Sequence, residues 1–330
     1  MNKFISKSIY KDYLECGKNA WLKLYKKSEL ENFFAFSSEE QSRLDKGNLT
    51  EFWAQKLFPM GILIEKNGEE AARLTAMHIE QRAPVLFQST FFNDIFLVRN
   101  DVLTYNEETK KWSLYEIKSK NSLEEKTNEI DHIEDATFQA IVLKECGIEL
   151  EEIFIVHLNK DYVRTADIDI KELFVLNNIT AKVNAREDRT RLRMQKAKID
   201  LSQDKEDSLI CQCIYSGRSA HCKTFGYSYP HIPNISVHDI ARISTKKLQP
   251  LINANILNID DVPSDFDLTE IQQRQVNAYK FKTPIFNASI IKQELNKLTF
   301  PLYFLDYESY PHPIPLFKGF KPWQQVPFQF

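Results

Sequence analysis

The chain has 330 residues, which is enough for two or three domains and excludes a disulfide-held mini-protein. Hydrophobic residues make up 43% and charged residues 27%, as in soluble globular proteins, and no apolar run approaches the roughly 20 residues that cross a bilayer. The formal net charge of −3 excludes a general excess of Lys and Arg, so any binding of nucleic acid has to be local.

The N-terminal segment shows no targeting signal. Its charges are scattered and it lacks the apolar stretch of a signal peptide, which places the protein in the cytoplasm. An odd number of cysteines in a chain without export signals also argues against a disulfide framework. These residues are therefore reduced thiols or metal ligands: Cys16, Cys146, Cys211, Cys213 and Cys222.

Two helices are predicted in the first part of the chain. Over residues 6–27, apolar side chains recur near helical spacing behind a serine N-cap, and this stripe puts Cys16 on a buried face. A second helix is predicted over residues 38–57, where Pro and Gly follow. It carries Gly47 and Glu51.

Residues 86–118 change to short runs rich in Phe, Val, Leu, Ile and Tyr. The polar stretch NEETKK reads as the turn of a hairpin with strands within 92–105 and 112–120. A helix over 131–147 that ends at Gly147 is expected next, followed by a buried strand over 152–158. The pattern predicts a mixed α/β architecture.

The C-terminal part is predicted to be largely helical. A long solvated helix fits the charged residues 178–208, and short helical patterns fill 235–298. The last stretch is aromatic and Pro-rich and stops on a strand-like run, so the chain is expected to be a fragment or a truncated relative. Four domains are predicted: a core at 1–174, a helix and cysteine region at 175–234 that packs back on the N-terminal helix, a helical spacer at 235–298, and a partial domain at 299–330.

The hairpin carries a pattern of charged residues. Alternation along the second strand sends Glu116 and Lys118 to one face, and the pairing can bring Asp101 of the first strand opposite Glu116. Paired carboxylates are suitable ligands for a hard divalent cation such as Mg²⁺, and the carbonyl of Ile117 is a further natural ligand. An ammonium beside that cation can orient a water molecule or offset developing charge, which is the role expected of Lys118.

Three stretches carry a resemblance to a known family: RND at 99–101, YEIKSK at 115–120 and DATFQ at 135–139. In order and spacing they resemble the RecB-like branch of the PD-(D/E)XK nucleases. The resemblance implies a restriction-endonuclease-like α/β core, a mixed sheet flanked by helices, with Asp101 and Glu116 as metal carboxylates, Lys118 as the catalytic lysine and Gln139 as the helix-borne site residue. It also implies Mg²⁺ or Mn²⁺ and DNA with single-stranded ends as the substrate of an exonuclease.

Two positions depart from that family. The glutamine is usually followed four residues later by tyrosine, and here Leu143 stands there. An upstream G-x-x-x-H often supplies another metal ligand, whereas this chain has Gly47 and Glu51; glutamate also binds hard cations. Glu51 is therefore included in the expected metal site.

Four cysteines form a second expected site. Cys211, Cys213 and Cys222 fall close together, and Cys16 can supply a fourth thiolate, which suits zinc or an iron–sulfur cluster. One group of RecB-like nucleases is similar, with one cysteine before the nuclease motifs and three after them, and this implies a four-iron four-sulfur cluster. The single residue between Cys211 and Cys213 departs from that group, so zinc stays open, as does substitution by His221. Cys146 is expected to be a buried, unligated thiol.

The sequence FLDYE at 304–308 places Asp306 and Glu308 on one face of a strand. It resembles the first motif of RNase H-like DEDD exonucleases. Together with the stretches above it is similar to a bacterial family of uncharacterised two-nuclease proteins. The remaining carboxylates of such a domain are absent from this chain, so Asp306 and Glu308 are expected to be inert, and the aromatic segment around them is expected to contact a protein partner.

Other functions stay open. An E-x-K tripeptide alone is common as an exposed ion pair, and only its combination with Asp101 and Gln139 favours a nuclease. The main alternative is a catalytically silent module that binds nucleic acid or a protein through a nuclease fold. A redox-dependent or zinc-dependent regulator with incidental carboxylates is a third interpretation. No membrane association is expected.

Overall fold

A computed structural model describes residues 3–122, 132–282, 284 and 286–329. The chain divides into two compact units, and each combines distant parts of the sequence. We call them the sheet unit and the cysteine unit. The sheet unit comprises Met1–Leu14, Ala35–Ser202 and Tyr307–Phe330, and the cysteine unit comprises Glu15–Phe34 and Gln203–Asp306.

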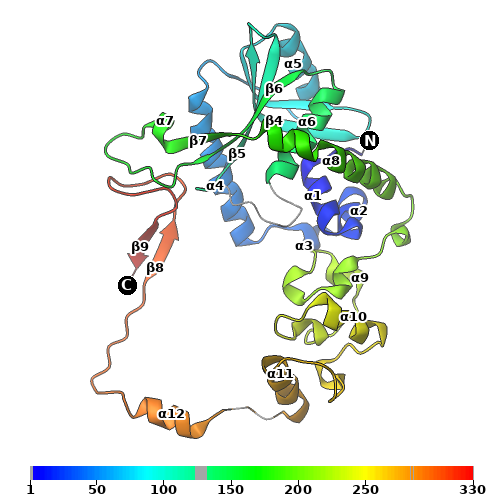
Figure 1. Cartoon of the computed structure of the whole chain (residues 1–330), viewed down its shortest axis with the longest axis vertical. Helices are drawn as coiled ribbons and strands as arrows, with labels where there is room; N and C mark the ends of the chain where they lie inside the picture. Colours follow the sequence, from blue (N-terminus) through cyan, green and yellow to red (C-terminus); the bar gives the residue numbers. More distant parts are fainter. Residues whose placement is uncertain (1–2, 123–131, 283, 285, 330) are drawn as a thin grey trace. The chain divides into compact units, whose positions relative to one another are not determined.

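The sheet unit contains a seven-stranded mixed sheet (Figure 1) with the strand order β2-β3-β4-β5-β6-β7, and β1 pairs with β4. Its parallel pairs are β1–β4, β2–β3 and β5–β6. Helices α4, α5, α6 and α8 pack against the strands, so the predicted α/β class with a mixed sheet flanked by helices is confirmed. The elements are β1 (Ile5–Ser6), α1 (Lys7–Glu15), α4 (Ser38–Ala54), η1 (Gln55–Leu57), β2 (Ile62–Leu63), α5 (Gly68–Glu80), β3 (Val85–Phe92), β4 (Phe96–Asn106), β5 (Lys111–Lys118), α6 (His132–Glu145), β6 (Leu150–Leu158), α7 (Ile170–Leu173), β7 (Phe174–Asn178), α8 (Thr180–Leu201), β8 (Glu308–Pro311) and β9 (Gln325–Gln329).

Strands β4 and β5 form the predicted hairpin. The Asn106 side chain accepts the backbone N–H groups of Glu108 and Thr109 at 2.9 and 3.4 Å, and this local bonding closes the turn. Leu103 and Leu114, which pair across the hairpin, are both 0% exposed. Burial of the pair fixes the register, because a slip of one residue would turn these side chains to the other face.

Helix α6 is buried along nearly all of its length. Apolar residues such as Phe138 and Leu143 are 0% exposed, and so is the polar Gln139. The helix stops before Gly147, whose φ of +81° is a conformation that glycine adopts without strain. The predicted helix and the strand after it are therefore confirmed.

The single helix predicted over residues 6–27 is wrong. Cys16 has an extended backbone (φ −158°, ψ 108°) that separates α1 from α2, and it caps the N-terminus of α2. Cys16 is 3% exposed, so its burial was predicted correctly. The break matters because it assigns α1 to the sheet unit and Cys16 to the cysteine unit.

The C-terminal residues of the sheet unit pack on its core. Ile314 is 3% exposed and lies in a cluster with Leu158 and Tyr162, against which Trp323 also packs. Arg164 donates to the carbonyls of two residues of this segment, at 3.0 and 2.8 Å. The predicted shared strand face of Asp306 and Glu308 is wrong, because β8 begins only at Glu308.

The cysteine unit consists of short helices. Two of them begin with complete capping boxes, at Ser236 and Thr269, which satisfy N–H groups that a helix start leaves free. Among the described residues, no helix has both the length and the apolar character to cross a membrane. The elements are α2 (Gly17–Tyr25), α3 (Glu31–Phe34), η2 (Glu206–Ser208), η3 (Gln212–Tyr215), η4 (Arg218–Ala220), α9 (Phe225–Ser228), η5 (Val237–Asp239), α10 (Thr245–Asn253), η6 (Ile259–Asp261), α11 (Glu270–Phe281) and α12 (Ala288–Leu295).

Candidate functional sites

The β4–β5 hairpin brings Asp101 and Glu116 to neighbouring positions. Their ladder pairs Val102 with Tyr115, and Asp101 and Glu116 come directly beyond that pair. The backbone N–H of Ile117 donates to Asp101 Oδ2 at 2.7 Å, so this carboxylate is tied to the edge of β5. The two acidic groups also repel each other, and this repulsion contributes to the raised pKa of Asp101.

Glu116 is the most contacted acidic group of this site. Its side chain is 1% exposed, and its Oε1 accepts from Lys7 Nζ at 2.6 Å and from Lys118 Nζ at 2.7 Å. Its other oxygen, Oε2, accepts from Gln139 Nε2 at 2.6 Å. Burial alone would raise the pKa of Glu116, but Lys118 and Lys7 lower it well below its usual range. This carboxylate is therefore ionised at neutral pH.

Helix α6 contributes two further polar groups. Gln139 accepts from Asn100 Nδ2 at 2.9 Å, which leaves its amide nitrogen directed at Glu116. Asp135 accepts from Lys118 Nζ at 3.0 Å through Oδ2. The Oδ1 atom of Asp135 is buried without a hydrogen-bond partner among the described residues, which is a costly state for a carboxylate oxygen. A bound cation or water molecule would satisfy it.

Glu51, on α4, is held by amides. Its Oε1 accepts from Gln55 at 3.1 Å and also from Gln88. Burial and Glu116 raise the pKa of Glu51, and these two hydrogen bonds lower it, with a net upward shift. Gln88 has a φ of +56° and leaves a gap in the β3–β4 ladder opposite Asp101.

The electrostatics of this group favour a cation. Burial first, and then the charge of Glu116, raise the pKa of Asp101 to about 7, even though Lys7 lies close enough to lower it. Burial and the neighbouring carboxylate both disfavour the ionised form of Asp101, and a divalent cation bound beside it would favour that form. Asp101, Glu116 and Glu51 do not all bring a ligand oxygen within 4.8 Å of one another among the described residues, so the carboxylates would have to close around an ion.

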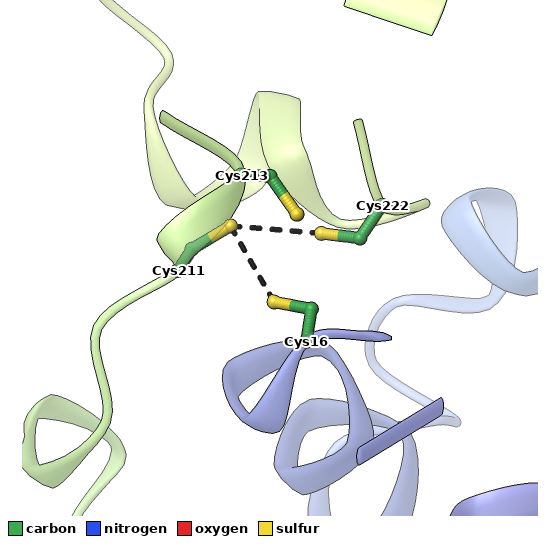
Figure 2. A group of neighbouring side chains, drawn as sticks. All are labelled: Cys16, Cys211, Cys213 and Cys222. Atoms are coloured by element: carbon green, nitrogen blue, oxygen red, sulfur yellow. Dashed lines mark hydrogen bonds between the residues drawn. The ribbon is translucent and has the colours of Figure 1, made fainter. Parts of the chain in front are cut away.

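The four predicted cysteines converge in the cysteine unit. Figure 2 shows Cys16 facing Cys211, Cys213 and Cys222 with all four sulfurs turned toward one another. The Sγ atoms all lie within 4.8 Å, with 3.7 Å between Cys16 and Cys211 and 3.6 Å between Cys211 and Cys222. Hydrogen bonds among the thiols, first that with Cys16, lower the pKa of Cys213 and raise those of Cys211 and Cys222. Four sulfurs in one buried group can bind a metal ion or cluster in place of these protons.

His221, expected as a substitute ligand, has other contacts. Its Nε2 lies 3.0 Å from the carbonyl oxygen of Ser216, and its ring stacks on Phe225 with centroids 3.5 Å apart. It therefore supports the fold beside the cysteines. Cys146 does not belong to the group of four and is only partly buried.

Sequence reasoning missed several residues of the carboxylate site. Lys7 contacts Glu116, which is 109 residues away in the sequence, and Gln88 contacts Glu51, which is 37 residues away. No local sequence pattern signals contacts over such separations. Asp135 stands inside the DATFQ motif, yet nothing in the motif indicated that it would contact Lys118. The one hint for Gln88 is a single amide in the otherwise apolar run VLFQ.

Similarity to known proteins is limited. A family described as "Domain of unknown function (DUF2779)" matches residues 303–330. No curated protein matches the chain. A solved structure from Eubacterium rectale named "Putative exonuclease" shares 13% identity with a TM-score of 0.36, over 61% of this chain and 82% of that one. A likeness at this level does not assign a function.

Proposed function

We propose that this chain hydrolyses phosphodiester bonds of nucleic acid with the help of a divalent cation. The observation that carries the proposal is the meeting of Lys118 and Gln139 on the buried carboxylate of Glu116, beside Asp101. These are the residues to which the resemblance to RecB-like PD-(D/E)XK nucleases assigns the chemistry. Asp101 lies on β4, Glu116 and Lys118 lie on the adjacent strand β5, and Gln139 lies on helix α6.

Each residue has a proposed role. Asp101, Glu116 and the carbonyl of Ile117 would hold Mg²⁺ or Mn²⁺, and Glu51 would turn from its amide partners to join them. Such a cation polarises a phosphoryl oxygen and lowers the pKa of a bound water. Lys118, held by Asp135, would orient the nucleophilic water and offset the negative charge of the transition state. Gln139 would position the Glu116 carboxylate.

The substrate follows from the resemblance. DNA with single-stranded ends is proposed because RecB-like relatives are mostly exonucleases, which is an argument by analogy. All five cysteines are free of disulfide bonds, which fits a reducing compartment, so we propose a cytoplasmic location. Contact of the exposed C-terminal aromatic residues with a protein partner stays a prediction, supported by side chains such as Tyr303 and Phe304, which are 89% and 92% exposed.

For the cysteine site, the sulfur distances favour one tetrahedral ion over the four-iron four-sulfur cluster that the resemblance implies. A tetrahedron with metal–sulfur bonds of about 2.3 Å has sulfur–sulfur edges of about 3.8 Å. Two of the sulfur–sulfur distances, 3.6 and 3.7 Å, lie near that value, and all four sulfurs lie within 4.8 Å of one another. In a four-iron cluster each cysteine binds a different iron, so the sulfurs would lie further apart. We therefore propose zinc.

Metal analysis of Cys222→Ser tests this site. The wild type should hold one zinc per chain, and the variant should lose it and unfold more readily, by about 4 kcal/mol if free zinc exceeds the dissociation constant about 1,000-fold. Cys146→Ser, outside the group, is the matched control and should change neither quantity. Four irons per chain in a brown protein would contradict the zinc proposal and support the four-iron four-sulfur cluster. An unchanged metal content in Cys222→Ser would refute both the zinc site and the cluster.

One observation favours the silent binding module. The charge of Glu116 is already compensated by two ammonium groups, and the carboxylates are not gathered as the sulfurs are. A protein that only binds nucleic acid could remain in this state. The two functions are distinguished by incubating a labelled single-stranded oligonucleotide with Mn²⁺ or Mg²⁺ and with EDTA: a nuclease shortens it only in the presence of the metal, whereas a silent module retains it intact.

A further inference from the structure

A second lysine reaches the candidate site from the start of the chain. Lys7 is the first residue of α1 and directly follows β1, which pairs in parallel with β4, the strand that carries Asp101. Ile5 is 0% exposed, and its N–H donates to the carbonyl of Ile95 at 2.8 Å. The backbone before Lys7 is thus fixed to the sheet.

Helix α1 is also held at its other contacts. Tyr10 is 1% exposed and donates to Glu134 Oε1 of α6 at 2.9 Å. Lys11 lies one turn after Lys7, on the same side of the helix, and its Nζ is 3.4 Å from Asp135 Oδ2. The helix therefore presents two ammonium groups along the acidic site from a rigid support.

Lys7 and Lys118 compete for one oxygen atom. Their Nζ atoms lie 2.6 and 2.7 Å from Glu116 Oε1. Lys118 has Asp135 as a second partner, whereas Lys7 has no other ion pair within the described ranges. The Lys7 side chain is also the more exposed of the two, at 27% against 17%.

This asymmetry decides which of the two lysine ammonium groups leaves Glu116 when a divalent cation binds there. An oxygen that ligates a divalent cation repels nearby ammonium groups, because like charges a few ångströms apart are unfavourable in a buried site. Lys118 would keep its ion pair with Asp135. Lys7 would lose its only ion pair among the described residues, and its side chain, 27% exposed, can turn toward solvent.

We propose that Lys7 is a substrate-binding residue, whose ammonium group leaves Glu116 and binds an oxygen of the substrate phosphate. The inference rests on the proposed nuclease function and deepens it. A phosphodiester group carries one negative charge, and lysine binds phosphate as a point charge without a fixed geometry.

Binding of a fluorescent single-stranded oligothymidylate in Ca²⁺ tests the proposal without cleavage. Lys7→Gln should weaken binding roughly tenfold and reduce the slope of log affinity against log salt by about 0.7, the value for one phosphate contact on a single strand. The matched control is Lys144→Gln, which also breaks a 2.6 Å ion pair, with Glu187, at a side chain 33% exposed. The control should change neither affinity nor slope.

A second measurement separates substrate binding from support of the metal site. Lys7→Gln should bind Mn²⁺ as tightly as wild type or more tightly, because a competing cation has been removed from Glu116. Weaker Mn²⁺ binding, or an unchanged oligonucleotide affinity and salt slope, would overturn the role of Lys7 while leaving the nuclease intact. A wild type that neither binds nor cleaves the oligonucleotide would overturn the proposed function as well.

The pair of variants Glu116→Gln and Glu116→Gln/Lys7→Gln guards against a folding artefact. In this background position 116 carries no charge, so neutralising Lys7 leaves no unpaired carboxylate at that position. The double variant should still lose about 0.7 of the salt slope relative to the single variant. Equal slopes in the two variants would refute a phosphate contact by Lys7.

Discussion

The Glu116 carboxylate receives hydrogen bonds from two ammonium groups and one amide, and its side chain is only 1% exposed. Each partner comes from a different element: Lys7 from α1, Lys118 from β5 and Gln139 from α6. A buried charge is tolerated only when it is paired and hydrogen-bonded. The ionised Glu116 therefore holds side chains from three elements together at one site.

Asp101 would make the proposed metal binding depend on pH. Burial and the charge of Glu116 raise its pKa to about 7, against about 3.9 in an unfolded chain. Because its pKa is raised, Asp101 binds its proton more tightly in the folded than in the unfolded chain. Its contribution to the free energy of unfolding is therefore present at acid pH and is lost as pH rises from about 4 to about 7. A metal ion requires the ionised form, so Mn²⁺ affinity should rise up to tenfold per pH unit below about pH 7 and level off above it.

Calorimetric titration with Mn²⁺ between about pH 5 and 8 measures this profile. Asp101→Asn should bind weakly and without the rise. Asp94→Asn, at a carboxylate 79% exposed and paired with Lys198, should keep the wild-type profile. A wild-type affinity that is flat across the range would show that Asp101 is not a ligand.

At the scale of elements, the hairpin and α6 could be predicted from the sequence because their signals are local. A polar turn separates two apolar runs, and Gly147 ends the helix. The contacts of α1 could not be predicted, since its partners lie more than a hundred residues away. The break between α1 and α2 at Cys16 was missed because the apolar residues keep helical spacing across it, although the backbone of Cys16 is extended.

The C-terminal segment is an element of the sheet unit and contributes to its stability. Ile314 is 3% exposed in the core, so Ile314→Ala should destabilise the sheet unit by about 2–5 kcal/mol through lost burial and the cavity left behind. Urea unfolding followed by far-ultraviolet circular dichroism measures the change. Leu316→Ala, at a side chain 43% exposed, is the control. Equal stabilities of the two variants would contradict packing of this segment on the core.

At the scale of the molecule, each compact unit holds one candidate site. The carboxylate site lies within the sheet unit and the four cysteines lie within the cysteine unit. Both units combine N-terminal and C-terminal segments. The four consecutive domains predicted from the sequence stay a prediction, as do the roles assigned to the site residues.

The sequence indicated which residues to consider for the site, but not how they contact one another. The resemblance selected Asp101, Glu116, Lys118 and Gln139, and the structure brings the last three into hydrogen-bond contact. It did not reveal the contact of Lys7 with Glu116, nor the distance of 3.6 Å between the sulfurs of Cys211 and Cys222. Motifs record residue types and spacing, whereas partners across the fold depend on packing.

The measurement that tests the central claim most directly is degradation of end-labelled single-stranded DNA with Mn²⁺, comparing wild type with Glu116→Gln. We expect shortened products from the wild type, none with EDTA, and a loss of at least about 100-fold in the variant, because the charge that binds the cation is removed. Lys144→Gln should cleave as the wild type does. Undiminished cleavage by a folded Glu116→Gln would exclude Glu116 from the reaction, and an inactive, folded, metal-loaded wild type would contradict the nuclease proposal.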